Sequence, residues 1–116
     1  MKESYTVINK TLIASLSGEL DQHSAVQVRA ELDRRIKEGC NNLVFDFKRL
    51  EFMDSSGIGV IIGRYKLVMA LGGAICIACP KPQVERIIHL ATIDRLIPIY
   101  KSVDDALKSM RGDRVG

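Results

Sequence analysis

Apolar runs with a period of two, or with no break at all, predict five strands in this chain, and helical spacing fills the segments between them. The predicted strands are residues 4–9, 11–17, 42–47, 74–79 and 96–100. The predicted helices are residues 24–38, 55–71 and 82–91, and a final helix that Ser102 caps. The order β-β-α-β-α-β-α-β-α is typical of an α/β domain. We therefore expect a mostly parallel mixed sheet with crossover helices and one antiparallel strand from an N-terminal hairpin.

Local signals mark where several of these elements end. Asn9-Lys10 suits a tight hairpin turn. Ser24, with Gln27 three residues later, matches a capping box at the start of the first helix, and Gly39 suits its C-terminal end. Ile58, Ile61, Ile62, Tyr65, Val68 and Met69 are expected to form the buried face of the second helix.

Two polar segments follow strands of the predicted sheet. Residues 18–21 are expected to leave the sheet after the second strand, and residues 48–51 to form a loop after the third. The segments 21–23 and 54–56 then both lie at the carboxyl edge of the sheet. Function in open α/β sheets is commonly found at this edge.

Length, composition and charge narrow the class of protein. A chain of 116 residues with 47% apolar and 27% charged residues suits one globular domain, expected over residues 4–111 with a loose tail at 112–116. The net charge of +3 is small and spread along the chain, so we expect no nucleic-acid partner. We expect no membrane partner either, because the longest charge-free run, residues 67–80, is too short to span a bilayer. We expect no signal peptide, and the three cysteines suit a reducing cytoplasm.

Hydroxyl chemistry concentrates in Asp54-Ser55-Ser56-Gly57, just before a glycine-spaced apolar helix. A helix cap needs one acid or hydroxyl, and here two hydroxyls stand beside an acid. A phosphate at this position would meet the free N–H groups of the helix N-terminus. We interpret the segment as a regulatory phosphoserine site and partner-docking surface. The residue types alone leave both Ser55 and Ser56 open as the acceptor.

The glycines of this helix support a close approach to its backbone. Gly57, Gly59 and Gly63 each cost roughly 1 kcal/mol relative to alanine inside a helix. Either the sheet or a partner protein is expected to pack against them.

Enzymatic and metal-site interpretations are weaker. The spacing GxGxxxG departs from the GxGxxG of nucleotide-binding turns, and the preceding strand ends too far upstream. A serine hydrolase would have to use His23 or His89, and the chain has no G-x-S-x-G elbow. Cys76 and Cys79 form a C-x-x-C inside an apolar strand, where they face opposite sides, and only Cys40 and a histidine could complete a zinc site. We therefore expect no catalytic residue, no cofactor, no metal site and inert buried thiols.

Two segments resemble a known family, the STAS domains of bacterial anti-sigma factor antagonists. Phe52–Lys66 closely resembles the family's signature, and Gly18–Ala25 is similar to its second landmark. The resemblance covers about residues 4–111. Gly63-Arg64-Tyr65-Lys66 and Ser56 are most similar to the sporulation branch, the antagonists of the anti-sigma factor of sigma-F.

The resemblance implies regulation by partner switching. The unphosphorylated antagonist binds an anti-sigma factor that is also a serine kinase, which releases the sporulation sigma factor. The kinase uses ATP to phosphorylate the serine after the motif aspartate, here Ser55, and a PP2C-type phosphatase reverses the reaction. The docking surface around the phosphosite is expected to contain the residues Asp21, His23, Asp54, Ser56, Gly57 and Ile58.

Some points stay open beside this resemblance. Gln22 stands where sporulation members often carry histidine, which puts only fine contacts of that loop in doubt. The free protein is expected to be a monomer. The alternatives are an antagonist in a general-stress sigma pathway, a STAS module in lipid or transporter regulation, and a small hydrolase or nucleotide-binding enzyme.

Overall fold

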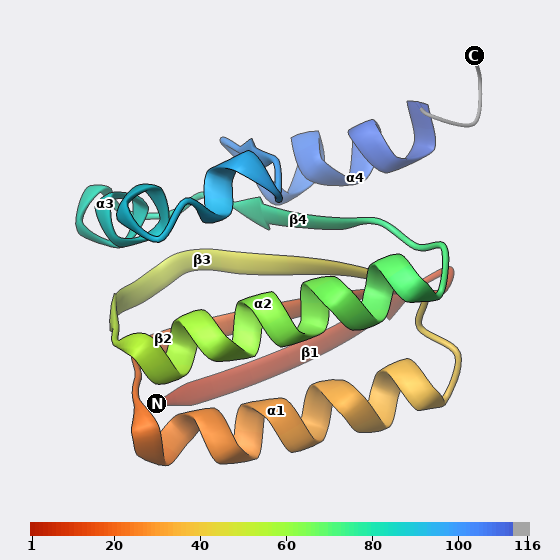
Figure 1. Ribbon diagram of the computed structural model, residues 1–116. Coiled ribbons are helices and arrows are strands. Elements are labelled where there is room, and N and C mark those ends of the chain that lie inside the picture. The colour runs from red at the N-terminus through yellow and green to blue at the C-terminus, as the bar shows by residue number, and fades with distance from the viewer. Residues whose placement is uncertain (113–116) are drawn as a thin grey trace.

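Five strands form one mixed sheet in the order β1-β2-β3-β4-β5 (Figure 1). The computed structural model describes the backbone of residues 1–112 and the side chains of residues 1–110. The strands are β1 (Lys2–Ile8), β2 (Thr11–Leu20), β3 (Asn42–Met53), β4 (Ile75–Ala78) and β5 (Ile99–Tyr100). β1 pairs antiparallel with β2, and the other neighbours pair in parallel. The predicted α/β class and mixed sheet are confirmed.

In the described part of the chain, four helices and one 3-10 turn connect and cover the strands. They are α1 (Gln22–Lys37), α2 (Ser55–Ala70), α3 (Pro82–Leu90), the turn Ile93–Arg95 and α4 (Val103–Gly112). Residue 112 ends α4, and the rest of the expected tail, 113–116, lies outside the described residues. Within residues 1–112, no helix combines the length and apolarity needed to cross a membrane.

The two faces of the sheet are covered unequally. α1, α2 and α3 pack on one face over the larger core, which is centred on Phe45, Phe47 and Ile77. α4 packs on the other face, where Ala106 and Met110 meet Ile13, Val44, Cys76 and Ala78. Figure 1 shows α1 and α2 running side by side across the sheet, with α4 on its own. The outer face of β1 and of the second halves of β2 and β3 is left open.

The predicted ends of the hairpin and of α1 are confirmed in part. Asn9 and Lys10 have φ of 48° and 64°, the left-handed pair that a tight two-residue turn requires. Gly39, with φ of 118°, follows the last turn of α1. The start of α1 differs from the prediction, because Asp21 is the N-cap and forms the capping box with Ser24. The expected pairing of Ser24 with Gln27 is wrong.

The predicted loop at 48–51 is wrong, and so is the early exit of residues 18–21 from the sheet. β2 continues to Leu20 and β3 to Met53 without a break. The register between them shifts between Ser15 and Ser17 and again between Gly18 and Glu19, which places one extra residue of β3 at each bulge. The buried residues of this part of β3 therefore fall three apart, which hides the period of two on which the prediction relied.

The buried face of α2 is rotated about the helix axis relative to the predicted face. Gly57, Val60, Ile61 and Val68 are buried, whereas Met69 is 50% exposed. Ile58, Ile62 and Tyr65 are half-buried against the core. Arg64 lies on this buried side between Ile61 and Val68, where it pairs with Asp33 of α1, so a charged residue interrupts the apolar pattern there.

The C-x-x-C does not straddle the sheet as expected. β4 ends at Ala78, and Cys79 has already turned, with φ of 61°. Cys76 and Cys79 both pack against the cluster under α4. Cys40 is buried on the opposite face, and its burial raises the pKa of the thiol.

One ion pair joins the two helices that cross the sheet together. The Nε of Arg64 on α2 lies 3.1 Å from the Oδ1 of Asp33 on α1. The Arg64 side chain is only 11% exposed and Asp33 is 35% exposed. Burial lowers the pKa of Arg64, and the Asp33 carboxylate opposes that effect.

We expect Asp33→Asn to lower the free energy of unfolding by about 1–3 kcal/mol, because a largely buried guanidinium would lose its counter-charge. Urea unfolding followed by circular dichroism measures this change. Glu38→Gln is the matched control, since it breaks an ion pair with Arg34 in which both side chains are more than half exposed. The control should change stability by less than about 1 kcal/mol. Equal effects in both variants would contradict the role of the pair.

Candidate functional site

The ends of β2 and β3 bring the predicted site residues to one edge of the sheet. Leu20 pairs with Met53 at the end of the parallel ladder. The backbone N–H of Asp54 donates to the carbonyl of Leu20 at 3.2 Å, so the two chain segments stay together as they leave the sheet. Asp21 and Asp54 are the next residues, and each begins a helix. The carboxyl ends of two neighbouring strands thus place two acidic helix caps side by side.

The start of α2 has the geometry of an anion-compatible helix N-terminus. Asp54 has extended φ and ψ of −104° and −166°, and its Oδ1 accepts the backbone N–H of Ser56 at 2.8 Å. The first backbone bond of the helix runs from the N–H of Ile58 to the carbonyl of Asp54. The first-turn N–H groups of such a helix start have no partner within the helix and favour negative charge near them.

The start of α1 repeats this arrangement with more hydrogen bonds. Asp21 Oδ1 accepts from the backbone N–H groups of His23 and Ser24, each at 3.0 Å. The Ser24 hydroxyl accepts the backbone N–H of Asp21 at 2.9 Å. The N–H of Ser24, together with its hydroxyl and the N–H of His23, holds the pKa of Asp21 below its ordinary value. Asp21 is therefore a fixed negative charge at this edge at neutral pH.

The two candidate serines differ in accessibility. Ser55 is exposed at the first position of α2, and its hydroxyl makes no hydrogen bond to any residue that the structure describes. Ser56 is half-buried and contributes its backbone N–H to the Asp54 cap. The cap is Asp54, and the Ser56 side chain takes no part in it.

The glycines of α2 have different surroundings. A Cβ at Gly57 would lie 2.8 Å from the Met53 Cβ and 3.0 Å from the Leu20 carbonyl oxygen. Gly57 therefore lets the helix sit directly on the two strand ends. A Cβ at Gly59 or Gly63 would meet nothing within 4 Å, so the sheet explains only Gly57.

The site contains no catalytic arrangement among the described residues. His89 lies on α3, where its Nδ1 is 2.8 Å from Asp94 Oδ2 and the ring is 77% exposed. His23 is exposed on the first turn of α1, and no hydrogen bond joins it to Ser55. No group of three or more metal-ligating side chains is found in the described part of the chain. A nucleophile activated by a neighbouring base is thus not assembled here.

An exposed aromatic residue beside the site was not predicted. Phe52 is 45% exposed, because the second bulge of β3 turns both Glu51 and Phe52 away from the core. Glu51 is held by an ion pair with Lys81 at the start of α3. The signal in the sequence is the buried spacing of three, from Phe47 to Leu50 to Met53. This spacing leaves Phe52 on the surface next to Asp54.

Comparisons with known proteins agree with this geometry. Residues 3–106 match the family model described as the STAS domain. An anti-sigma F factor antagonist of Paenibacillus polymyxa is 41% identical over 85% of this chain and 86% of its own length. The structure of the anti-sigma factor antagonist SpoIIAA in its unphosphorylated form has a TM-score of 0.86 and 28% identity, covering 96% of this chain and 97% of that one. SpoIIAA of Bacillus in its phosphorylated form has a TM-score of 0.75 and 26% identity, covering 99% and 100%.

We expect Gly57→Ala to lower the free energy of unfolding by about 1–3 kcal/mol, because its Cβ forces α2 away from Leu20 and Met53. Gly59→Ala is the matched control, since its Cβ enters open space, and it should raise stability by up to about 1 kcal/mol through helix propensity. Thermal and urea unfolding of the two variants give the comparison. A neutral Gly57→Ala variant would show that α2 does not rest on the strand ends.

Proposed function

This chain belongs to the STAS domain family of anti-sigma factor antagonists, which are regulators rather than enzymes, and we propose that its docking surface is the edge formed by the starts of α1 and α2. In this proposal the unphosphorylated protein binds an anti-sigma factor that is also a serine kinase. The kinase transfers the γ-phosphoryl group of ATP to the Ser55 hydroxyl, and a PP2C-type phosphatase hydrolyses the phosphoserine. Both reactions take place in the cytoplasm, and each of them is carried out on this chain by another protein.

The exposure of Ser55 is the observation that supports this proposal most directly. Its hydroxyl is accessible to a kinase, is free of hydrogen bonds to the described residues and stands at the first position of a helix. Asp21 and Asp54 flank it from the two helix caps. His23, Ser56, Gly57 and Ile58 lie in the first turns of the same two helices. Ser55 is therefore at the centre of the proposed surface, with Phe52 at its rim.

We expect the fold to tolerate a phosphate on Ser55 and the binding of a partner to be weakened by it. The N-terminus of α2 stabilises a nearby anion by about 0.3–1 kcal/mol. A phosphoserine adds about −1.5 to −2 charges next to two carboxylates, which a docked protein would have to desolvate or match. Changing a partner from 99% to 1% bound needs about 5.5 kcal/mol of differential affinity. Burial of an unmatched dianion in an interface reaches this order of magnitude.

The finer assignment is to the sporulation sigma factor, sigma-F. The 41% identity to an anti-sigma F factor antagonist supports this choice over a general-stress pathway. In this assignment the protein releases sigma-F when it is unphosphorylated and leaves sigma-F inhibited when Ser55 carries phosphate.

We expect Ser55→Ala to abolish phosphorylation by the anti-sigma kinase and ATP while keeping binding to that kinase. Ser55→Asp should weaken binding by about tenfold or more, because one extra charge enters the interface. Ser56→Ala is the matched control and should still be phosphorylated. Phosphate incorporation followed by mass spectrometry and isothermal titration calorimetry measure these effects. Phosphate on Ser56 in the unchanged protein would contradict the site assignment.

The pathway assignment has its own test. We expect the unphosphorylated protein to bind the anti-sigma factor of sigma-F at least about tenfold more tightly than that of a general-stress sigma factor, a difference of about 1.4 kcal/mol. Calorimetry with the two purified anti-sigma factors compares them directly. Tighter binding to the general-stress partner would assign the chain to that pathway and leave the role of Ser55 intact.

A further inference from the structure

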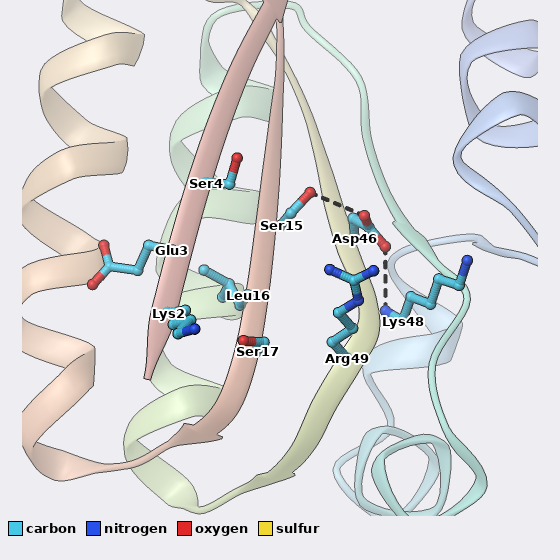
Figure 2. Close-up of a pocket in the computed structure, with 9 residues that line it drawn as sticks. All are labelled: Lys2, Glu3, Ser4, Ser15, Leu16, Ser17, Asp46, Lys48 and Arg49. Carbon is cyan, nitrogen blue, oxygen red and sulfur yellow. Dashed lines mark hydrogen bonds between the residues drawn. The ribbon is translucent and has the colours of Figure 1, made fainter.

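The part of the open sheet face that α4 does not cover carries a groove with charged and hydroxyl side chains in its lining (Figure 2). The groove has a volume of about 510 Å³. This volume is in the range of sites that hold small molecules. Its lining residues are Lys2, Glu3, Ser4, Ser15, Leu16, Ser17, Asp46, Lys48 and Arg49. Figure 2 shows that β1, β2 and β3 all contribute side chains to it.

The groove has three cationic side chains and two acidic ones, so its lining keeps a small excess of positive charge. Lys2, Lys48 and Arg49 form no ion pair with any residue that the structure describes. The Glu3 carboxylate points away from the groove in Figure 2, and it accepts the hydroxyl of Tyr5 at 2.7 Å. A hollow whose cations outnumber its acids, and are not held in ion pairs, favours an anionic ligand.

The other acid of the groove, Asp46, is held by two hydrogen bonds from neutral donors and keeps its negative charge. Asp46 Oδ2 accepts from the Ser15 hydroxyl at 2.9 Å, and its Oδ1 accepts the backbone N–H of Lys48 at 3.2 Å. Figure 2 shows the Arg49 guanidinium on the same side of the sheet, extended toward Asp46 and Ser15. Asp46 thus holds the polar floor of the groove in place while the guanidinium stays available.

The first bulge of β3 is the reason that Arg49 faces this groove. Asp46 pairs with Ser15, and after the bulge Arg49 pairs with Ser17, so both lie on the open face. In an unbroken strand Arg49 would point into the core, because side chains alternate. Bulges commonly serve to re-aim a side chain. Here the bulge brings a guanidinium next to the serines of β2, whose hydroxyls can donate to an oxyanion.

We propose that this groove binds the phosphate group of a small soluble molecule, with Arg49 as its main cationic contact. Lys2 and the hydroxyls of Ser4 and Ser17 complete the donor set, and Lys48 stands at the rim with its ammonium pointing outward in Figure 2. A guanidinium with hydroxyl donors matches the several acceptor oxygens of a phosphate. The groove is larger than a phosphate ion, so the ligand carries a further group. This site is separate from Ser55 and does not depend on the proposed partner switch.

Titration of the full unphosphorylated chain with inorganic phosphate and then with glycerol 3-phosphate tests this proposal. Two-dimensional ¹H–¹⁵N NMR spectra at constant ionic strength locate the contacts. We expect saturable shifts at the amides of Ser4, Ser15, Ser17 and Arg49, with glycerol 3-phosphate binding more tightly than phosphate. Arg49→Ala should weaken the affinity by about tenfold or more, the usual effect of losing a hydrogen bond to a charged group.

Arg86→Ala is the matched control, because Arg86 is an exposed cation on α3 outside the groove. It should leave the affinity unchanged. The proposal is overturned by shifts that do not saturate, by shifts centred on residues 54–57 at the start of α2, or by equal losses in the two variants. Binding only to vesicles that contain phosphatidic acid, with none to glycerol 3-phosphate, would overturn the assignment to a soluble ligand.

Discussion

The parallel pairing of β2 with β3, in a register that ends both strands at the same edge, is the constraint on which the rest of the structure depends. Leu20 and Met53 close the ladder, and the N–H of Asp54 bonds to the Leu20 carbonyl just beyond it. Parallel strands need a crossover, so α1 must start at this edge and return to the opposite one. α2 starts from the same edge one strand later. The proposed regulatory surface is therefore a direct product of strand register.

The order of helices and strands can be predicted from the sequence because the apolar residues of most elements keep the single period of a strand or of a helix. The sequence predicts the hairpin turn at Asn9-Lys10, the apolar stripe of α1 and the buried β4. It fails in the second half of β3, where two bulges change the spacing of buried residues from two to three. A bulge depends on the partner strand, so the spacing of three from Phe47 to Leu50 to Met53 indicates it only once that strand is known. The same bulges expose Phe52 and turn Arg49 onto the open face. The positions of these two side chains could not be predicted from β3 alone, because the pairing of β3 with β2 decides where they point.

In the candidate site, residue types alone cannot decide which serine accepts the phosphate. Ser55 and Ser56 both follow Asp54 and carry the same hydroxyl, and only the resemblance to a family favours Ser55. In the structure they are no longer equivalent. Asp54 takes the N–H of Ser56 for the cap and leaves the Ser55 side chain exposed at the first position of α2. The geometry supports Ser55 because capping assigns one of the two residues to the helix and leaves the other to solvent.

The proposed phosphoserine switch would have to act on the partner rather than on the fold. Helix N-terminal stabilisation of a phosphate is about 0.3–1 kcal/mol, which is too small to rearrange a domain whose helix rests on Gly57 against two strand ends. The added charge instead meets Asp21 and Asp54, which are already held as hydrogen-bonded caps and cannot move aside without loss of those bonds. A rigid, negatively charged edge therefore changes its electrostatic potential without changing its shape. In the proposed switch, this rigidity would let one covalent group at Ser55 control binding, because none of its effect would be absorbed by local rearrangement.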